Sequence, residues 1–215
     1  MKKLITEFIG TFFLVFTIGG AVASGNVLAP IAIGAVLMVM VFAGGHISGA
    51  HYNPAVSLAV TIRGKMEWRE MFQYWIAQLA GGIVGALVSH AVTRNEAAIQ
   101  MAPEMNVMTS LPVIAELLGT FALAYVVLNV ATAKGNAGNS FYGLAIGFTV
   151  MSMAVAVGGI SGGAFNPAVG IGRGLADLTV GSAENLTHVW IYIVGPLLGG
   201  AIAGWTFRYL NPDDL

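Results

Sequence analysis

The chain of 215 residues contains no cysteine and very little charge. Without cysteine there can be no disulfide, no thiolate metal site and no cysteine nucleophile. Charged residues make up 9% of the chain, against about 25% in soluble domains. So little charge could not cover the surface of a soluble protein of this size, which disfavours an ordinary cytosolic enzyme. The net charge of -1 argues against nucleic acid as a partner.

Apolar residues are abundant instead, at 57% of the chain. A helix needs about 20 mostly apolar residues to cross a bilayer. Six runs meet this length: Leu4–Ser24, Val27–Gly44, Trp68–Val92, Leu111–Ala133, Phe141–Val157 and His188–Tyr209. We take the first run as a span and not a cleaved signal peptide, because it is long and contains Glu7. The sequence therefore predicts an all-α, multi-pass integral membrane protein in a lipid bilayer.

Two further apolar runs, Pro54–Thr61 and Pro167–Leu175, are too short to cross and are expected to be re-entrant half-helices. With six spans both termini lie on one side. That side would hold seven of the nine Lys and Arg residues, so the positive-inside rule places both termini in the cytoplasm. We expect the membrane to be a prokaryotic inner or plasma membrane.

The two halves of the chain repeat each other. Three markers recur in the same order: Glu-x-x-Gly-Thr-Phe from Glu7 and Glu116, Asn-Pro-Ala-Val from Asn53 and Asn166, and x-x-x-Gly-Gly from Gln78 and Pro196. Each half holds three spans, an odd number, so the second copy must enter the membrane from the opposite side. This is an inverted 3+3 repeat, and such folds place their site near the midplane, where the broken helices meet.

The duplicated Asn-Pro-Ala explains what that site could do. Asn is a strong helix N-cap and Pro is favoured at the first helical position, so each copy starts a short helix. Two such starts would bring two helix N-termini together, each with about half a positive charge. A cation meets a positive field there, whereas water or a small polyol meets two Asn donors. We expect the Gly-rich segments Gly45–Tyr52 and Gly158–Phe165 to be irregular and to supply carbonyl acceptors along a pore.

These motifs resemble the aquaporin, or major intrinsic protein, family over essentially the whole chain. The resemblance implies one channel domain over 1–215, with halves of about 1–100 and 107–215, assembled as a homotetramer. It implies passive flux of water or small neutral solutes with ions excluded, no catalysis and no cofactor or metal. It assigns the paired motif to Asn53, Pro54, Ala55, Asn166, Pro167 and Ala168, and a pore-lining role to His51.

The chain departs from the family at the constriction. Members usually carry Arg three residues after the second Asn, where this chain has Val169; Arg173 lies about one helical turn further on. The other constriction positions, transferred by spacing, are Ile33, Ala154 and Gly163. This set is small, apolar and uncharged, which predicts a wider gate with less local repulsion of cations. Val at this position resembles branches associated with neutral metalloid hydroxides, so glycerol-like polyols and such hydroxides are both expected solutes.

The intramembrane acids Glu7 and Glu116 are functional candidates by default. Their symmetric placement favours a structural role, accepting hydrogen bonds from the adjacent irregular loops. Three alternatives stay open. A strict water channel would exclude glycerol, and an ion-coupled inverted-repeat transporter would require an ion gradient. An intramembrane serine protease is suggested by Gly159–Gly162, which reads Gly-x-Ser-Gly, and would need a base near Ser161.

Overall fold

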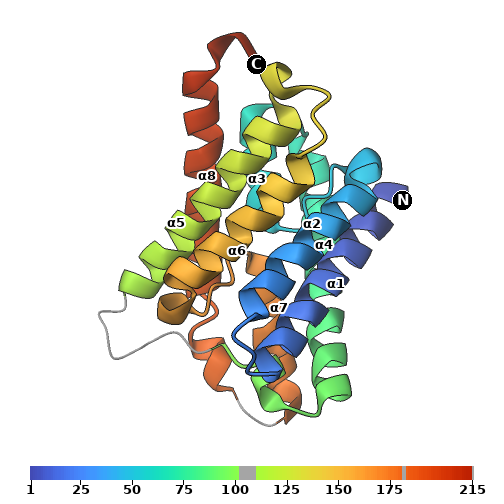
Figure 1. Cartoon of the computed structure of the whole chain (residues 1–215), viewed down its shortest axis with the longest axis vertical. Helices are drawn as coiled ribbons and strands as arrows, with labels where there is room; N and C mark the ends of the chain where they lie inside the picture. The colour runs from blue at the N-terminus through green and yellow to red at the C-terminus, as the bar shows by residue number, and fades with distance from the viewer. Residues whose placement is uncertain (102–109, 181–182, 215) are drawn as a thin grey trace.

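A computed structural model describes residues 1–101, 110–180 and 183–214, and the regular structure of these residues is helical (Figure 1). The α-helices are α1 Lys2–Ala23, α2 Ala29–Ser48, α3 Pro54–Arg63, α4 Trp68–Thr93, α5 Ser110–Val127, α6 Tyr142–Ser161, α7 Pro167–Asp177 and α8 Ile191–Leu210. Short turns are η1 Glu96–Ala98, η2 Leu128–Thr132, η3 Lys134–Asn136, η4 Leu178–Val180, η5 Glu184–Thr187 and η6 Pro212–Asp214. The prediction of an all-α protein is confirmed.

Six helical segments are long and apolar enough to cross a membrane: α1, α2, α4, α5 with η2, α6, and α8 with the η5 region. The half-helix predictions correspond to α3 and α7. The sequence prediction was wrong about the ends of α2 and α6, which continue through Gly45 and Gly158 to Ser48 and Ser161. Glycine at these positions does not stop a helix that is packed on its neighbours. The helices end where Gly49 and Gly162 adopt φ of 86° and 91°, which suits a glycine C-cap.

The six spans pack side by side in the contact order α4, α1, α2, α6, α5, α8, which makes an incomplete ring. The half-helices fill the remaining gap: α7 packs on α4 and α8, and α3 packs on α8 and α4. Each half-helix therefore lies against the last span of the opposite half as well as its own. Two matching halves produce one closed bundle.

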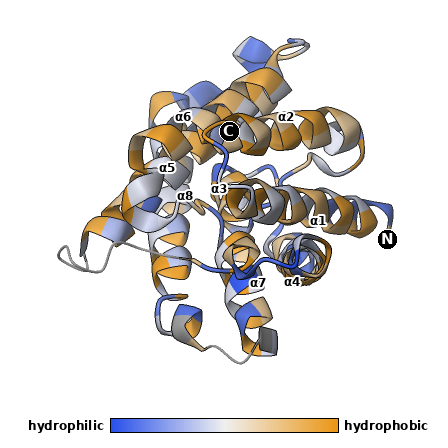
Figure 2. Ribbon diagram, turned by 60° about the horizontal axis from the view of Figure 1, so that its bottom comes forward, coloured by the Kyte–Doolittle hydropathy of each residue, from blue (hydrophilic) through white to orange (hydrophobic). Residues whose placement is uncertain are grey.

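The outward surface of the ring is apolar. Ile76 on α4, Val155 on α6 and Trp205 on α8 are 70%, 71% and 61% exposed. Apolar residues run along α1 and α2 in Figure 2, and hydrophilic residues gather mainly at helix ends and in connections. A surface of this kind is stable in lipid and not in water.

The duplicated Gly-Gly pairs permit the close packing that this bundle needs. A Cβ on Gly81 would clash with the Phe8 carbonyl oxygen of α1, and one on Gly82 would lie 2.5 Å from the Ala168 carbonyl oxygen of α7. Gly199 and Gly200 of α8 make the equivalent approaches to α5 and α3. One glycine of each pair thus faces the first span of its own half, and the other faces the half-helix of the opposite half. Small residues let helix backbones approach in this way.

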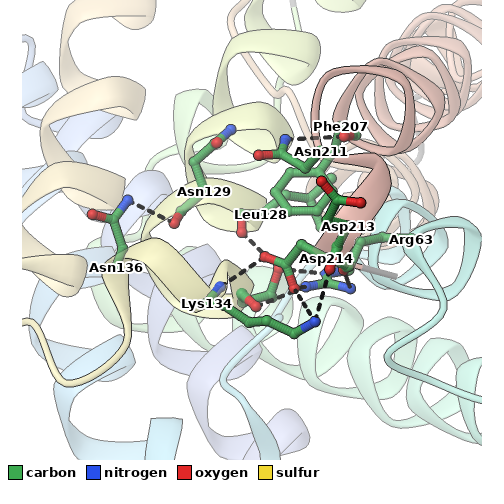
Figure 3. A network of polar contacts seen from close by, with 10 residues as sticks. Arg63, Leu128, Asn129, Lys134, Asn136, Phe207, Asn211, Asp213 and Asp214 are labelled. Carbon is green, nitrogen blue, oxygen red and sulfur yellow. Dashed lines mark hydrogen bonds and ion pairs between the residues drawn. The ribbon is translucent and has the colours of Figure 1, made fainter.

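Both chain ends lie on one side of the bundle, called the termini side below, because Asp214 contacts Arg63 at the end of α3 and Lys3 contacts Glu70 near the start of α4. Figure 3 shows the contacts of Arg63. Its guanidinium donates to the Thr132 hydroxyl and carbonyl at 2.8 Å and to the Asp214 carbonyl and carboxylate at 2.8 and 3.0 Å. This latch ties the last turn of the chain to α3 and to the connection after η2.

The carboxylate of Asp214 is held by charge and by a hydrogen bond. The backbone N–H of Lys134 donates to it at 2.7 Å, and the Arg63 guanidinium lies beside it. These contacts lower the pKa of Asp214 below its usual value. The latch is therefore in its strongest state when Asp214 is ionised.

Candidate functional site

Two short irregular loops, Gly49–Tyr52 and Gly162–Phe165, connect the spans to the half-helices. Their backbones are unusual. Ala50, Tyr52 and Phe165 have φ of 52°, 50° and 47°, a left-handed conformation that residues with a Cβ rarely adopt. Such a conformation costs about 1–3 kcal/mol and persists only where its surroundings enforce it.

The buried carboxylate of Glu7 is what holds the first loop. It accepts hydrogen bonds from the Ser48 hydroxyl at 2.7 Å and from the backbone N–H groups of His51 and Tyr52 at 3.0 and 2.7 Å. The amide of Gln78 donates to the same carboxylate at 2.8 Å. Because all four partners are donors, the loop is complementary to a carboxylate acceptor.

Glu116 repeats the arrangement in the second half. Its donors are the Ser161 hydroxyl at 2.7 Å and the backbone N–H groups of Ala164 and Phe165 at 2.9 and 2.6 Å. Ser161 is fully buried and its hydroxyl is committed to Glu116. In the part of the chain that the structure describes, no histidine contacts this hydroxyl, so the geometry does not support a serine nucleophile.

Two tyrosines that the sequence analysis did not single out support the same loops. The hydroxyl of Tyr74 donates to the Ser48 carbonyl at 2.8 Å, and that of Tyr192 donates to the Ser161 carbonyl at 2.6 Å. Both tyrosines are buried. Tyr74 lies four residues before Gln78, and Tyr192 lies four residues before Pro196, the first residues of the two Gly-Gly markers. The tyrosines therefore occupy equivalent positions in the repeat, and this equivalence could have identified them.

The Asn of each Asn-Pro-Ala motif binds the residue that precedes the other motif, so the two motifs meet. The Oδ1 of Asn53 caps α3 by accepting the Ala55 N–H at 2.9 Å, and its Nδ2 donates to the Phe165 carbonyl of the other half at 2.8 Å. Asn166 caps α7 in the same way, and its Nδ2 donates to the Tyr52 carbonyl at 2.9 Å. Each Nδ2 carries two hydrogens. Among the described residues no partner takes the second one.

A narrow cavity passes this meeting point. For the centre of a water molecule its volume is about 20 Å³, and about 10–15 Å³ suffices for one water. Its lining includes six residues that the sequence analysis selected: Ile33, His51, Asn53, Gly163, Asn166 and Val169. The imidazole of His51 contacts the Ser57 hydroxyl at 3.1 Å. Carbon atoms of both halves form the rest of the wall.

Wider cavities adjoin the narrow one at both ends. On the termini side, a cavity of about 510 Å³ lies among His46, Thr132, Lys134 and neighbouring residues, and it shares Ile146 with the narrow cavity. On the opposite side, a cavity of about 160 Å³ is lined by Ala154, Arg173 and the shared residues Ile33, Gly163 and Val169. This second wide cavity, on the side opposite the termini, is called the outer cavity below. Ala154 lines the outer cavity and does not line the narrow one. The narrow cavity thus shares lining residues with a wider cavity on each side, and together the three outline a candidate path that is narrow at its middle.

Comparison with known proteins places this geometry in a family. The family model "Major intrinsic protein" matches residues 1–207. The chain is 35% identical to the rice protein "Aquaporin NIP2-1", covering all of this chain and 72% of that one. It is 36% identical to "Glycerol uptake facilitator protein-like 6" of Lactiplantibacillus plantarum, covering all of both chains. The fold matches the aquaglyceroporin of Plasmodium falciparum with a TM-score of 0.88 over 98% of this chain and 97% of that one, at 22% identity. The chain belongs to the major intrinsic protein family.

Proposed function

We propose that the chain is a passive channel that conducts water and small neutral solutes along this path, as one domain over residues 1–215. The observation that carries the proposal is the reciprocal pair of hydrogen bonds at the narrow middle of the path, from Asn53 to the Phe165 carbonyl and from Asn166 to the Tyr52 carbonyl. The rice relative is named an aquaporin, and the bacterial relative is named a glycerol uptake facilitator protein. The family consists of channels and not of enzymes, so no catalysis is assigned.

The meeting point offers donors and a positive field. The second hydrogen of each Nδ2 and the N-termini of α3 and α7 all favour an oxygen acceptor over a cation. Glu7 and Glu116 act as structural acceptors that fix the loops, since their oxygens are engaged by loop donors. An ion-coupled transporter would need a carboxylate free to titrate within the spans, and the engagement of both acids argues against that alternative.

We further propose that Ile33, Ala154, Gly163 and Val169 form the selectivity constriction. Three of them line both the narrow and the outer cavity. Their side chains are small or apolar, which favours polyols and neutral metalloid hydroxides over a strict filter for water. The small volume of the narrow cavity favours the alternative, a strict water channel, because a glycerol would require side chains to move aside. Assembly as a homotetramer and a cytoplasmic position for both termini remain predictions.

The test is osmotic flux in liposomes that contain the purified protein. Stopped-flow light scattering would follow shrinkage in sucrose, then re-swelling in glycerol and in boric acid. We expect fast shrinkage and re-swelling that exceeds that of empty liposomes. Fast shrinkage without solute entry would establish the strict water channel. Shrinkage no faster than in empty liposomes would refute the proposal of a channel.

Two variants, Ala154→Phe and Val169→Arg, test the proposed constriction, and a third serves as the control. Ala154→Phe fills the outer cavity and should lower glycerol flux at least about tenfold while water flux falls less, because a pore discriminates by diameter. Ala156→Phe adds the same ring two residues away, at an exposed position on α6 outside the cavity linings, and serves as the control. Val169→Arg should also lower solute flux. Unchanged glycerol flux in both Ala154→Phe and Val169→Arg would show that the constriction lies elsewhere.

A further inference from the structure

Two arginines are buried in the bundle, and they differ in how their charge is balanced. Arg63 is 1% exposed and Arg173 is 2% exposed. Arg63 faces the Asp214 carboxylate at 3.0 Å. In the described ranges 1–101, 110–180 and 183–214, no carboxylate forms an ion pair with Arg173. A buried guanidinium without a counter-charge is costly unless it has a use.

Arg173 stands close to the constriction. It lies four residues after Val169 on α7, so both side chains share one face of the helix. α7 starts where the two Asn-Pro-Ala motifs meet, and Arg173 lies one turn beyond Val169, further from that point. Arg173 and Val169 both line the outer cavity, together with Ile33 and Gly163. A solute that crosses the outer cavity therefore passes a wall to which this residue contributes.

The contacts of Arg173 fix its position and leave its charge uncompensated. Its Nη2 donates to the backbone carbonyls of Ala97, at 3.0 Å, and Gln100. These acceptors belong to the connection after α4, which the guanidinium therefore holds beside the outer opening. Its Nε is buried and has no hydrogen-bond partner among the described residues, and no partner is found there for Nη1. Carbonyl groups carry no net charge, so no formal counter-charge balances this arginine, which lines the cavity.

We propose that Arg173 determines the charge selectivity of this channel, supplying at the outer cavity the cation barrier that Val169 cannot supply at the constriction. The proposal rests on the function proposed above and adds a residue to it. With the charge of Arg173 outside the constriction, the narrow part of the path stays apolar for neutral solutes. Cations that enter from the outer cavity are repelled one helical turn before they reach Val169. A unit charge acting over several ångströms through an effective dielectric of about 20 changes cation entry by at least about tenfold.

The first test compares Arg173→Gln with Arg173→Lys in liposomes loaded with a K⁺-sensitive dye. Gln can still donate to a loop carbonyl but carries no charge, whereas Lys keeps the charge and lacks the planar fork. We expect K⁺ influx through Arg173→Gln to rise at least about tenfold and Cl⁻ influx not to rise. Arg173→Lys should exclude K⁺ nearly as well as the unmodified channel. Arg94→Gln, at an exposed arginine on the same side, is the matched control and should change nothing.

A second variant covers the case in which Arg173→Gln does not fold. Ala29→Glu adds a carboxylate at the first turn of α2, where an acidic residue is favoured, and Ala29 lines the same outer cavity. It should raise K⁺ influx with Arg173 and its carbonyl contacts in place.

Each outcome decides the question. The inference is overturned if Arg173→Gln retains water flux and still excludes K⁺. If Arg173→Gln does not fold, the same result in Ala29→Glu overturns it. Equal K⁺ leakage through Arg173→Gln and Arg173→Lys would also overturn it, because loss of the anchored connection would then be the cause. If the unmodified protein conducts no water, the proposed function itself fails, and that result is distinct from both.

Discussion

Replacing Glu116 by Gln should destabilise the protein more than the loss of one formal charge suggests. The carboxylate accepts three donors at 2.6–2.9 Å. An amide has one acceptor oxygen, so its NH₂ group must oppose at least one of these donors. Depending on which way the amide faces, either the Phe165 N–H loses its acceptor, or the Ser161 hydroxyl and the Ala164 N–H lose theirs. In both cases the unpaired donor is buried.

The size of the effect follows from these contacts. A hydrogen bond to a charged group contributes about 1.5–3 kcal/mol, and an unsatisfied buried donor adds a penalty of similar size. We therefore expect Glu116→Gln to destabilise by about 2–4 kcal/mol. Glu7→Gln should destabilise more, because Glu7 accepts a fourth donor, the Gln78 amide. The left-handed backbone at Phe165 would lose support in Glu116→Gln, and that at Tyr52 would lose support in Glu7→Gln.

Thermal unfolding in detergent, followed by tryptophan fluorescence at one fixed scan rate, measures the difference. At about 2–4 °C per kcal/mol for a chain of this size, the midpoint for Glu116→Gln should fall by roughly 5–15 °C. Glu96→Gln alters an exposed acid in η1 and should leave the midpoint in place. A midpoint for Glu116→Gln equal to that of Glu96→Gln would refute the view that the acid holds the loop.

Two other predictions concern packing and the latch. Gly82→Ala should lower the unfolding midpoint strongly, because the new Cβ would lie 2.5 Å from the Ala168 carbonyl oxygen. Gly20→Ala has open space at its Cβ and should leave stability unchanged or raise it by up to about 1 kcal/mol. Equal shifts of the midpoint in the two variants would contradict the packing argument. Because the folded protein lowers the pKa of Asp214, its contribution is present above the unfolded pKa and is lost as the pH falls through the folded value. Unfolding midpoints measured from neutral to acidic pH should therefore fall less steeply in Asp214→Asn than in the unmodified protein, and parallel curves would show that the contact with Arg63 contributes nothing.

The sequence was sufficient for the spans and the half-helices, because hydropathy and duplication report them independently. A single Asn-Pro-Ala is uninformative, but two copies in register with Glu7 and Glu116 determine an inverted pair. The ends of α2 and α6 were misjudged because glycine composition was taken as irregular backbone. What ends each helix is the left-handed conformation of one glycine, Gly49 or Gly162, and composition does not reveal φ.

Contacts between residues far apart in the chain were out of reach for a different reason. Nothing in the local sequence indicates that Asp214 binds Arg63, or that Arg173 binds the carbonyls after α4. These pairs are not part of the repeat, so no second copy points to them. Tyr74 and Tyr192, in contrast, do repeat, and a comparison of the halves position by position would have found them.

The hydrogen bonds that Asn53 and Asn166 each make to the loop of the opposite half have a consequence for biogenesis. The Nδ2 of Asn53 has its partner at Phe165, more than a hundred residues later. While the ribosome is still making the second half, the first half can insert its spans and can form α3, but Asn53 has no carbonyl to bind. Residues of both halves line all three cavities, so the path can close only after the second half, with α7, is in place. A chain whose synthesis stops before Phe165 therefore lacks the acceptor of Asn53 and has no finished path.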